Sequence, residues 1–294
     1  MTDDRPVLGI SFMLGFCLLA PLGDAVAKVL GETIPLLMLL MIRFLAQAVL
    51  LWPIVWWTRQ PVRLTPRYTW LMILRTLLHI IGIGAMFTSL RFLPLADAVA
   101  IAFVMPFIML LLGRFFLNEE VGPQRLIACA IGFVGTLMVV QPSFAEVGSP
   151  ALLPLLVAVV FALFLLVTRL VAKEVDAMNL QAQSAVLACA ILGAVAFLLP
   201  PEMRFITPSA TEMWLLVAIG VVGTVAHLLM TWSLRFAPST TLAPMQYLEI
   251  PIATAFGWLI FRDLPNGLAA AGIIVTIAAG LYVIWREQRV ASAA

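Results

Sequence analysis

Long apolar runs alternate with short polar breaks along the whole chain. A helix needs about 20 apolar residues to cross the hydrocarbon layer of a bilayer, and runs of that length predict ten helices. Their expected bounds are 8–29, 35–57, 69–90, 94–117, 124–141, 151–170, 179–199, 212–234, 238–261 and 267–285. Breaks such as LPLAD, NEEVGP and LPPEM are rich in Pro and Gly, which favours short connections between neighbouring helices. No run alternates with period two, so the pattern predicts an all-α integral membrane protein and argues against a β-barrel.

Composition supports this fold class. Of 294 residues, 63% are hydrophobic and 11% charged, and the mean hydropathy is +1.10, whereas soluble domains carry roughly 25% charged residues. The net charge of +2, spread over short loops, argues against nucleic acid as a partner. Three cysteines, all in apolar runs, predict no disulfide framework. We expect no cleavable signal peptide, because residues 1–7 carry two acids and the first apolar run is long.

The Lys and Arg residues predict the orientation. If the N-terminus is cytoplasmic, eleven basic residues fall at inner loops and helix ends and four at outer ones. The inner ones are Arg5, Arg59, Arg63, Arg67, Arg114, Arg125, Arg169, Lys173, Arg235, Arg286 and Arg289, and the outer ones Lys28, Arg91, Arg204 and Arg262. An excess of positive charge marks the cytoplasmic side. Both termini are therefore predicted to be cytoplasmic, in a bacterial inner membrane.

An internal repeat divides the chain. Residues 70–94 and 214–238 both begin with Trp and end in SLRFxP, at a constant offset of 144. After one gap, Pro106, Gly122 and Gly135 match Pro251, Gly267 and Gly280 at an offset of 145. The halves 1–145 and 146–294 each hold five predicted spans. Because five is odd, the second half enters the membrane from the opposite side, and such inverted repeats favour a carrier that exposes a midplane site alternately to either side.

Two segments carry a family resemblance. Residues 100–120, AIAFVMPFIMLLLGRFFLNEE, and residues 246–263, QYLEIPIATAFGWLIFRD, resemble the fourth and ninth helices of EamA-type carriers of the drug/metabolite transporter superfamily. The resemblance covers nearly the whole chain and implies two five-helix repeats and secondary transport of small metabolites, such as amino acids and their derivatives, riboflavin or S-adenosylmethionine. The family's helix-nine Glu before Pro falls on Glu249. Here Ile250 intervenes before Pro251, and Arg262-Asp263 stands where the family often has Gly-Glu.

Four ionisable residues lie deep within predicted spans. Glu249, His79 and His227 are near the midplane, and Arg43 is about eight residues into the second span. A charge at the bilayer centre costs at least about 2.5 kcal/mol, so each should face protein or water. Glu249 is either a substrate-binding or proton-carrying carboxylate, or a structural partner of Arg43 or a histidine. The histidines either take part in proton coupling or hydrogen-bond between helices, and Arg43 binds a substrate anion or neutralises Glu249.

Uncharged residues extend this candidate site. Gln246 shares a helix face with Glu249, Tyr247 adjoins them, and Gln47 lies one turn from Arg43. Trp232 is a candidate for stacking on a flat substrate, with ordinary packing as the alternative. Pro106 and Pro251 occupy matching places in the two halves, as hinges or as static kinks.

Two further charged positions are predicted to lie outside the site. Arg75 is close to the cytoplasmic end of its span and is expected to extend to the interface. Asp24 and Lys28 are four residues apart near the outer end of the first span and are expected to form an exposed pair.

The pattern predicts a secondary active transporter for a small polar or zwitterionic metabolite. Amino-acid-like solutes come first, because the deep residues combine an acid, a guanidinium, imidazoles and an amide, and riboflavin or another flat heterocycle comes next. Proton coupling is open, and so is a monomer or a homodimer. An intramembrane enzyme or a channel without alternating access is the alternative, but no HExxH, P-loop or positioned nucleophile is present. Neither a metal site nor a cofactor is expected.

Overall fold

The computed structural model describes residues 5–58, 65–118, 122–140, 148–262 and 267–293, and the regular elements in this part of the chain are all helices. Seven helical segments within it are long and apolar enough to cross a membrane. They are α1 (Pro6–Gly31), α2 (Leu36–Trp57), α3 (Pro66–Ser89), the pair α4 (Leu95–Ala102) and α5 (Met105–Phe116), α8 (Leu152–Ala172), α9 (Ala177–Leu198) and α10 (Ala210–Phe236).

The remaining helices have shorter apolar stretches. They are α6 (Pro123–Val140), the consecutive pieces α11 (Ser239–Gln246), α12 (Glu249–Phe256) and η3 (Gly257–Phe261), and α13 (Gly267–Ala293). Short 3-10 turns, η1 (Ser149–Ala151) and η2 (Pro201–Met203), precede α8 and α10. Every apolar run predicted from the sequence thus coincides with a helix or with consecutive helices. The predicted boundary between residues 145 and 146 lies outside the described residues.

Two segments are broken at matching places. α4 ends at Ala102 and α5 begins at Met105, while α11 ends at Gln246 and α12 begins at Glu249, so the breaks differ by the repeat offset of 144. A proline removes one backbone donor and clashes with the carbonyl four residues earlier. Pro106 and Pro251 therefore interrupt their helices about one turn before the proline itself, and each proline lies in the first turn of the helix that follows.

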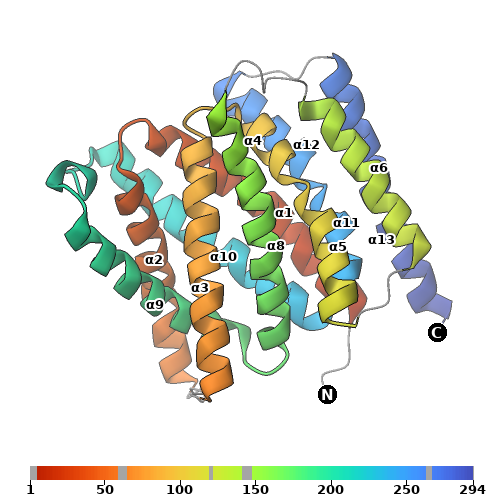
Figure 1. Cartoon of the computed structure of the whole chain (residues 1–294), viewed down its shortest axis with the longest axis horizontal. Helices are drawn as coiled ribbons and strands as arrows, with labels where there is room; N and C mark the ends of the chain where they lie inside the picture. Colours follow the sequence, from red (N-terminus) through yellow and green to blue (C-terminus); the bar gives the residue numbers. More distant parts are fainter. Residues whose placement is uncertain (1–4, 59–64, 119–121, 141–147, 263–266, 294) are drawn as a thin grey trace.

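The helices form a flattened bundle with both chain ends on one side (Figure 1). α6 and α13 pack together along one edge, α2 and α9 along the other, and α1 packs against α10 through the middle. α3 runs away from the side that carries the termini, whereas its repeat partner α10 runs toward it (Figure 1). These two equivalent helices therefore run in opposite directions.

Basic side chains hold helix ends together in the first half. The Lys28 ammonium at the end of α1 donates hydrogen bonds to the carbonyls of Leu90 (3.2 Å) and Leu93 (2.5 Å), just after α3. Arg91 donates from its guanidinium to the Ile34 carbonyl (3.0 Å), just before α2. Carbonyls at helix ends lack partners within the helix and carry partial negative charge, so cations stabilise them.

The second half repeats these contacts at the opposite side of the bundle. Arg169 near the end of α8 donates to the carbonyls of Leu234 and Arg235 at the end of α10. Arg235 donates to the Val175 carbonyl (3.5 Å) just before α9 and lies 3.7 Å from the Asp176 carboxylate. The repeated SLRFxP motif therefore has a structural basis, because its Arg ties the third helix of each half to the start of the second.

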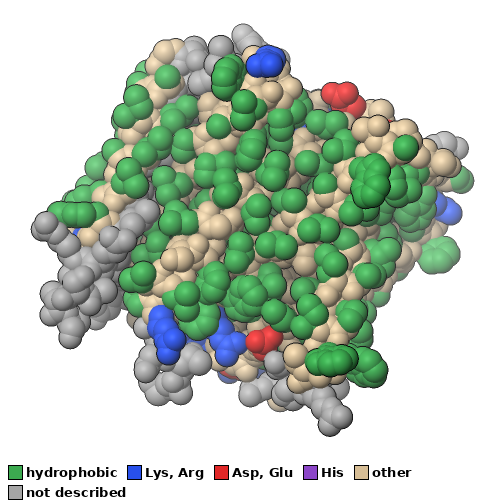
Figure 2. Space-filling view, turned by 180° about the vertical axis from the view of Figure 1, so that it is seen from behind, with side chains coloured by type: hydrophobic (Ala, Val, Ile, Leu, Met, Phe, Trp, Pro, Cys, Tyr) green, Lys and Arg blue, Asp and Glu red, His purple; other side chains and the backbone are tan. Residues whose placement is uncertain are grey.

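The surface suits a bilayer. Hydrophobic side chains cover the middle of the face shown in Figure 2, and the charged side chains drawn there gather toward its edges. Large apolar side chains face outward along the helices, among them Trp56, Trp57, Phe197 and Trp214, each more than two-thirds exposed. Lipid contact accounts for this exposure, since no membrane protein needs to hide such groups from hydrocarbon.

Candidate functional site

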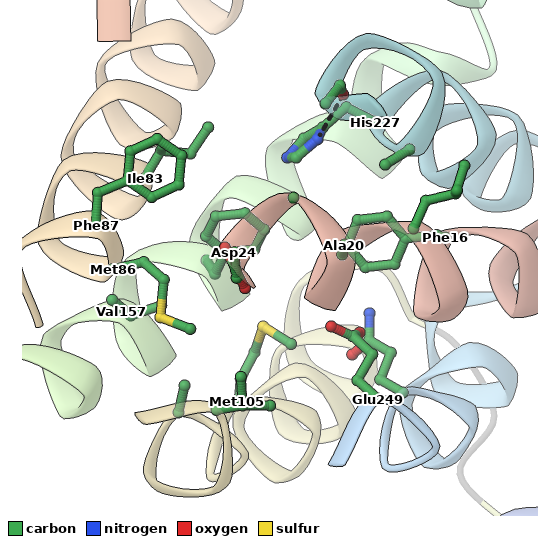
Figure 3. A pocket seen from close by; sticks show the side chains of 18 of the residues that line it. Phe16, Ala20, Asp24, Ile83, Met86, Phe87, Met105, Val157, His227 and Glu249 are labelled. Atoms are coloured by element: carbon green, nitrogen blue, oxygen red, sulfur yellow. Dashed lines mark hydrogen bonds between the residues drawn. The ribbon is translucent and has the colours of Figure 1, made fainter. Parts of the chain in front are cut away.

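A cavity of about 90 Å³ lies where the two halves meet (Figure 3). This volume suffices for several water molecules. Helices α1 to α5 on one side and α8, α10, α11 and α12 on the other contribute to its wall. Most of the lining is apolar, with aromatic rings and methionines, and its polar side chains are Asp24, Arg43, His227, Gln246 and Glu249.

Two carboxylates face the cavity from different halves. Glu249 is the first residue of α12, directly after the helix break, and is 8% exposed. A helix N-terminus presents free N–H groups and partial positive charge, which favour an acid there. Asp24 points inward from α1 (Figure 3). The Cys17 thiol also lies against Glu249, with Sγ 3.9 Å from Oε1.

Arg43 crosses from α2 to α10 and meets His227. Its Nη2 lies 2.8 Å from His227 Nδ1, and 3.5 Å from the Gly223 carbonyl oxygen, to which it donates. A Cβ at position 223 would lie 2.9 Å from Arg43 Nε, so glycine is what lets the guanidinium rest on α10. Arg43 Nη1 is buried and has no hydrogen-bond partner among the described residues.

His79 lies behind His227, away from the cavity wall. The two imidazole centroids are 4.5 Å apart, and His79 also stacks on Phe164 at 4.5 Å. It is fully buried, and neither ring nitrogen has a partner within the described residues. His79 is thus next to the site without lining it.

The other predicted site residues point elsewhere. The Gln47 amide nitrogen donates to the Gln181 backbone carbonyl (2.8 Å) and side-chain oxygen (2.9 Å). Tyr247 is buried at the helix break, and its ring packs on Gly132, where a Cβ would lie 2.6 Å from Cδ2. Trp232 packs against Phe12 with centroids 5.5 Å apart. Of the eight proposed residues, Glu249, Arg43, His227 and Gln246 are brought together at the cavity.

The sequence analysis predicted the wrong location for two charged side chains, Arg75 and Asp24. Arg75 does not reach the interface: it is fully buried, its Nε donates to Thr168 Oγ1 (2.9 Å), and its guanidinium carbon lies 4.7 Å from the Phe164 ring centre. Asp24 lines the cavity instead of an exposed surface. A signal for Arg75 was present, since Thr76 and His79 place further polar groups on the same part of the helix.

The chain matches the EamA-like transporter family twice, over residues 7–141 and 148–286. The S-adenosylmethionine uptake transporter of Rickettsia felis is 27% identical over 97% of this chain and 95% of its own length. The riboflavin transporter of Rhizobium johnstonii is 29% identical over 76% of this chain and 72% of its own length. The pseudopaline exporter of Pseudomonas aeruginosa is 26% identical over 71% and 72% respectively.

A solved structure shares the fold. It superposes with a TM-score of 0.71 at 18% sequence identity, over 94% of this chain and 95% of the other. Two matched domains cover nearly the whole chain, and the relatives are transporters rather than enzymes. The chain is therefore a multi-pass membrane protein that belongs to the EamA-like transporter family.

Proposed function

We propose that this chain is a secondary carrier with ten membrane crossings, arranged as two inverted five-helix halves with cytoplasmic termini. The equivalent basic contacts at opposite ends of the bundle and the two helix breaks at one sequence offset support the inverted arrangement. Broken helices at matching places commonly bound the substrate site in such folds, and movement of one half against the other then exposes the site alternately.

The cavity's charged groups carry the substrate assignment. With Asp24 and Glu249 ionised and Arg43 protonated, the lining holds one net negative charge. A substrate with one net positive charge complements it: the carboxylate of an amino-acid group lies toward Arg43, and its cationic groups lie toward the two acids. Phe87, Phe103 and Phe161 offer faces for a flat ring and for a cation.

S-adenosylmethionine has this chemistry, since it joins an α-amino acid to a sulfonium and a purine. Several relatives are S-adenosylmethionine uptake transporters, which supports the same choice. We therefore propose an amino-acid metabolite with an additional positive charge, S-adenosylmethionine foremost. Riboflavin is the second candidate, favoured by the aromatic lining and by a relative of that function; being uncharged, it does not engage the two acids.

Counterflow in proteoliposomes tests the proposal. Vesicles preloaded with unlabelled S-adenosylmethionine should accumulate labelled S-adenosylmethionine transiently and saturably, which a channel does not do. Glu249→Gln should lower the rate at least about tenfold, because a charged hydrogen bond to the substrate is lost. Saturable counterflow of riboflavin alone, unaffected by Glu249→Gln, would assign the second candidate, and flux without counterflow would refute a carrier.

A pH gradient across the same vesicles addresses coupling. Glu249 and Asp24 are the acids that face the cavity, so we propose them as the groups that exchange a proton for the cationic substrate. Uptake should accelerate when the compartment that receives substrate is the more acidic one, since a proton then leaves as substrate enters. A rate that is indifferent to the gradient would remove this coupling.

A further inference from the structure

Six buried nitrogen atoms beside the cavity lack hydrogen-bond partners among the described residues. They are Arg43 Nη1, Arg75 Nη1 and Nη2, His79 Nδ1 and Nε2, and His227 Nε2. The four residues are between 0% and 7% exposed. A buried polar group without a partner is costly and rare in native structures, so this concentration of them marks groups that water or a ligand would satisfy.

These residues form one continuous stack across the halves. The Arg75 guanidinium lies over the Phe164 ring at 4.7 Å, and Phe164 stacks on His79 at 4.5 Å. His79 then meets His227 at 4.5 Å, and His227 meets Arg43 at 2.8 Å. The stack therefore leads from the cavity wall at Arg43 to Arg75, deeper toward the side of the bundle where α3 begins.

The observed cavity extends toward the opposite side of the bundle, where α3 ends. Phe87 lies in the last turn of α3, and Val157 lies near the start of α8. These helix ends are at the side of the bundle opposite the termini (Figure 1). The stack lies near the middle of the bundle, with His79 and Phe164 close to the midpoints of α3 and α8, and Arg75 is nearer the side of the termini than Phe87 is.

The repeat predicts where a cavity of the opposite orientation would open. Exchanging the conformations of two inverted halves turns a site that faces one side into a site that faces the other. Among the residues of the present lining, the offset of 144 carries Ile219 to Arg75, Gly223 to His79, Phe87 to Thr231, and Phe103 to Tyr247. It also relates Ile83 to His227, Ala102 to Gln246 and Met105 to Glu249, which line the cavity already. Of the first four equivalents, Arg75, His79 and Tyr247 have buried polar atoms for which the described residues offer no partner.

Hydrogen bonds between the halves close this region at present. Gln47 bonds to Gln181, and Thr76 Oγ1 lies 2.8 Å from Ser184 Oγ. Within the second half, Gln181 donates to Thr231 Oγ1 at 2.7 Å. These are polar contacts that water can replace at little cost, unlike the apolar contacts of Gly82 with Phe161 nearer the other side.

We propose that the chain has a second, state-dependent subsite: when it opens toward the side of its termini, Arg75 and His79 line the cavity and bind the carboxylate of the substrate. The inference rests on the proposed carrier function. It assigns Arg43 to the carboxylate in the present conformation and Arg75 in the opposite one. The donors that are unpaired now become the ligand contacts of the other state.

Cysteine accessibility tests the cavity without any substrate. In a variant with Cys17, Cys129 and Cys189 replaced by Ala, single Phe87→Cys, Thr231→Cys and Thr224→Cys changes are exposed to a membrane-impermeant maleimide from either side. Thr224 is the matched control, because it is buried in α10 and bonds to its own helix four residues back at 2.7 Å, as Thr231 does, and neither it nor its equivalent lines the present cavity.

Thr231→Cys should react from the cytoplasmic side at least about tenfold faster than Thr224→Cys, and Phe87→Cys should react from the outer side. Thr231→Cys reacting no faster than the control, or only from the outer side, would overturn the proposal. Because labelling does not depend on transport, a carrier that exchanges S-adenosylmethionine and fails this test keeps the proposed function while losing the second subsite.

Counterflow from each side tests the role of Arg75. Arg75→Gln should raise the half-saturating substrate concentration about tenfold on the cytoplasmic side and less than about twofold on the outer side, and Arg75→Lys should restore part of the loss. A purely structural role predicts equal changes on both sides. Equal changes, or a larger change on the outer side, would refute the assignment of Arg75 to the carboxylate.

Discussion

Gly223 sets how closely Arg43 approaches α10, and with it the charge arrangement of the site. A Cβ there would lie 2.9 Å from Arg43 Nε and 3.2 Å from its Cζ. The guanidinium would have to move away from His227, which it now meets at 2.8 Å. One missing methyl group thus decides where the cationic group of the cavity lies.

We therefore expect Gly223→Ala to slow counterflow at least about tenfold, since misplacing a binding group by a fraction of an ångström is costly. Overpacking should also destabilise the fold by about 1–3 kcal/mol. Gly193→Ala is the control: a Cβ there would meet no other part of the described chain within 4 Å, and helix propensity favours Ala by about 1 kcal/mol. Thermal unfolding and counterflow of both variants check this, and parental transport in Gly223→Ala would contradict it.

Burial of the ionisable residues was predictable at this scale, and rotation about the helix axis was not. Counting residues predicted that Glu249, His79, His227 and Arg43 face protein or water and not lipid, and all four side chains are buried. Tyr247 and Gln47 lie at similar depths, yet they face Gly132 and Gln181 and not the cavity. Which side of a helix faces the other half depends on how the helices of the two halves pack together. Counting residues along one helix does not predict that orientation.

At the scale of elements, each half is tied together by a basic side chain that reaches across to the end of another helix. Lys28 binds the carbonyls that follow α3, and Arg169 binds those that end α10. The sequence repeat signalled this only through the SLRFxP motif. The residues that bind this motif lie about 60 residues away in the sequence, and only the packed structure identifies them. Lys28 and Leu90, for example, are 62 residues apart.

Removing either cation should destabilise its half. Lys28→Met and Arg169→Met keep much of the side-chain volume but leave helix-end carbonyls without their donors, so each should lower the free energy of unfolding by about 1–3 kcal/mol. The smaller figure applies to Lys28, which is only partly buried. Lys28→Arg keeps a donor and is the control. Denaturant unfolding in detergent checks the pair, and parental stability in both Met variants would show that the carbonyls find other partners.

Helix bounds followed from the apolar runs, whereas the breaks did not. The predicted spans 35–57 and 151–170 are α2 (Leu36–Trp57) and α8 (Leu152–Ala172) in the structure. Pro106 and Pro251 predicted an irregularity in their helices, but a proline can produce either a kink or an interruption. The structure has interruptions, at 103–104 and 247–248, and these put Glu249 at the start of a helix, in the wall of the cavity.

For the whole molecule, the place of the termini together with the relative direction of α3 and α10 distinguishes an inverted repeat from a parallel one. With five crossings in each half, the chain returns to its starting side only at the end of the second half. The distribution of basic residues predicts that this side is the cytoplasm. In the structure, the start of α1 and the end of α13 lie at one side of the bundle (Figure 1). An even number of crossings per half would also put both ends together, but would orient α3 and α10 alike.

Reporter placement separates these cases. Tags before residue 6 and after residue 293 should be shielded in intact spheroplasts and exposed in inverted vesicles, whereas a tag inserted between residues 145 and 146 should show the opposite pattern, because five crossings separate it from either end. A tag that shares its side with both termini would leave each half with an even number of crossings. The offset that maps the observed cavity onto Arg75 and His79 would then relate two sites facing the same side, and alternating access by exchange of the halves would lose its geometric basis.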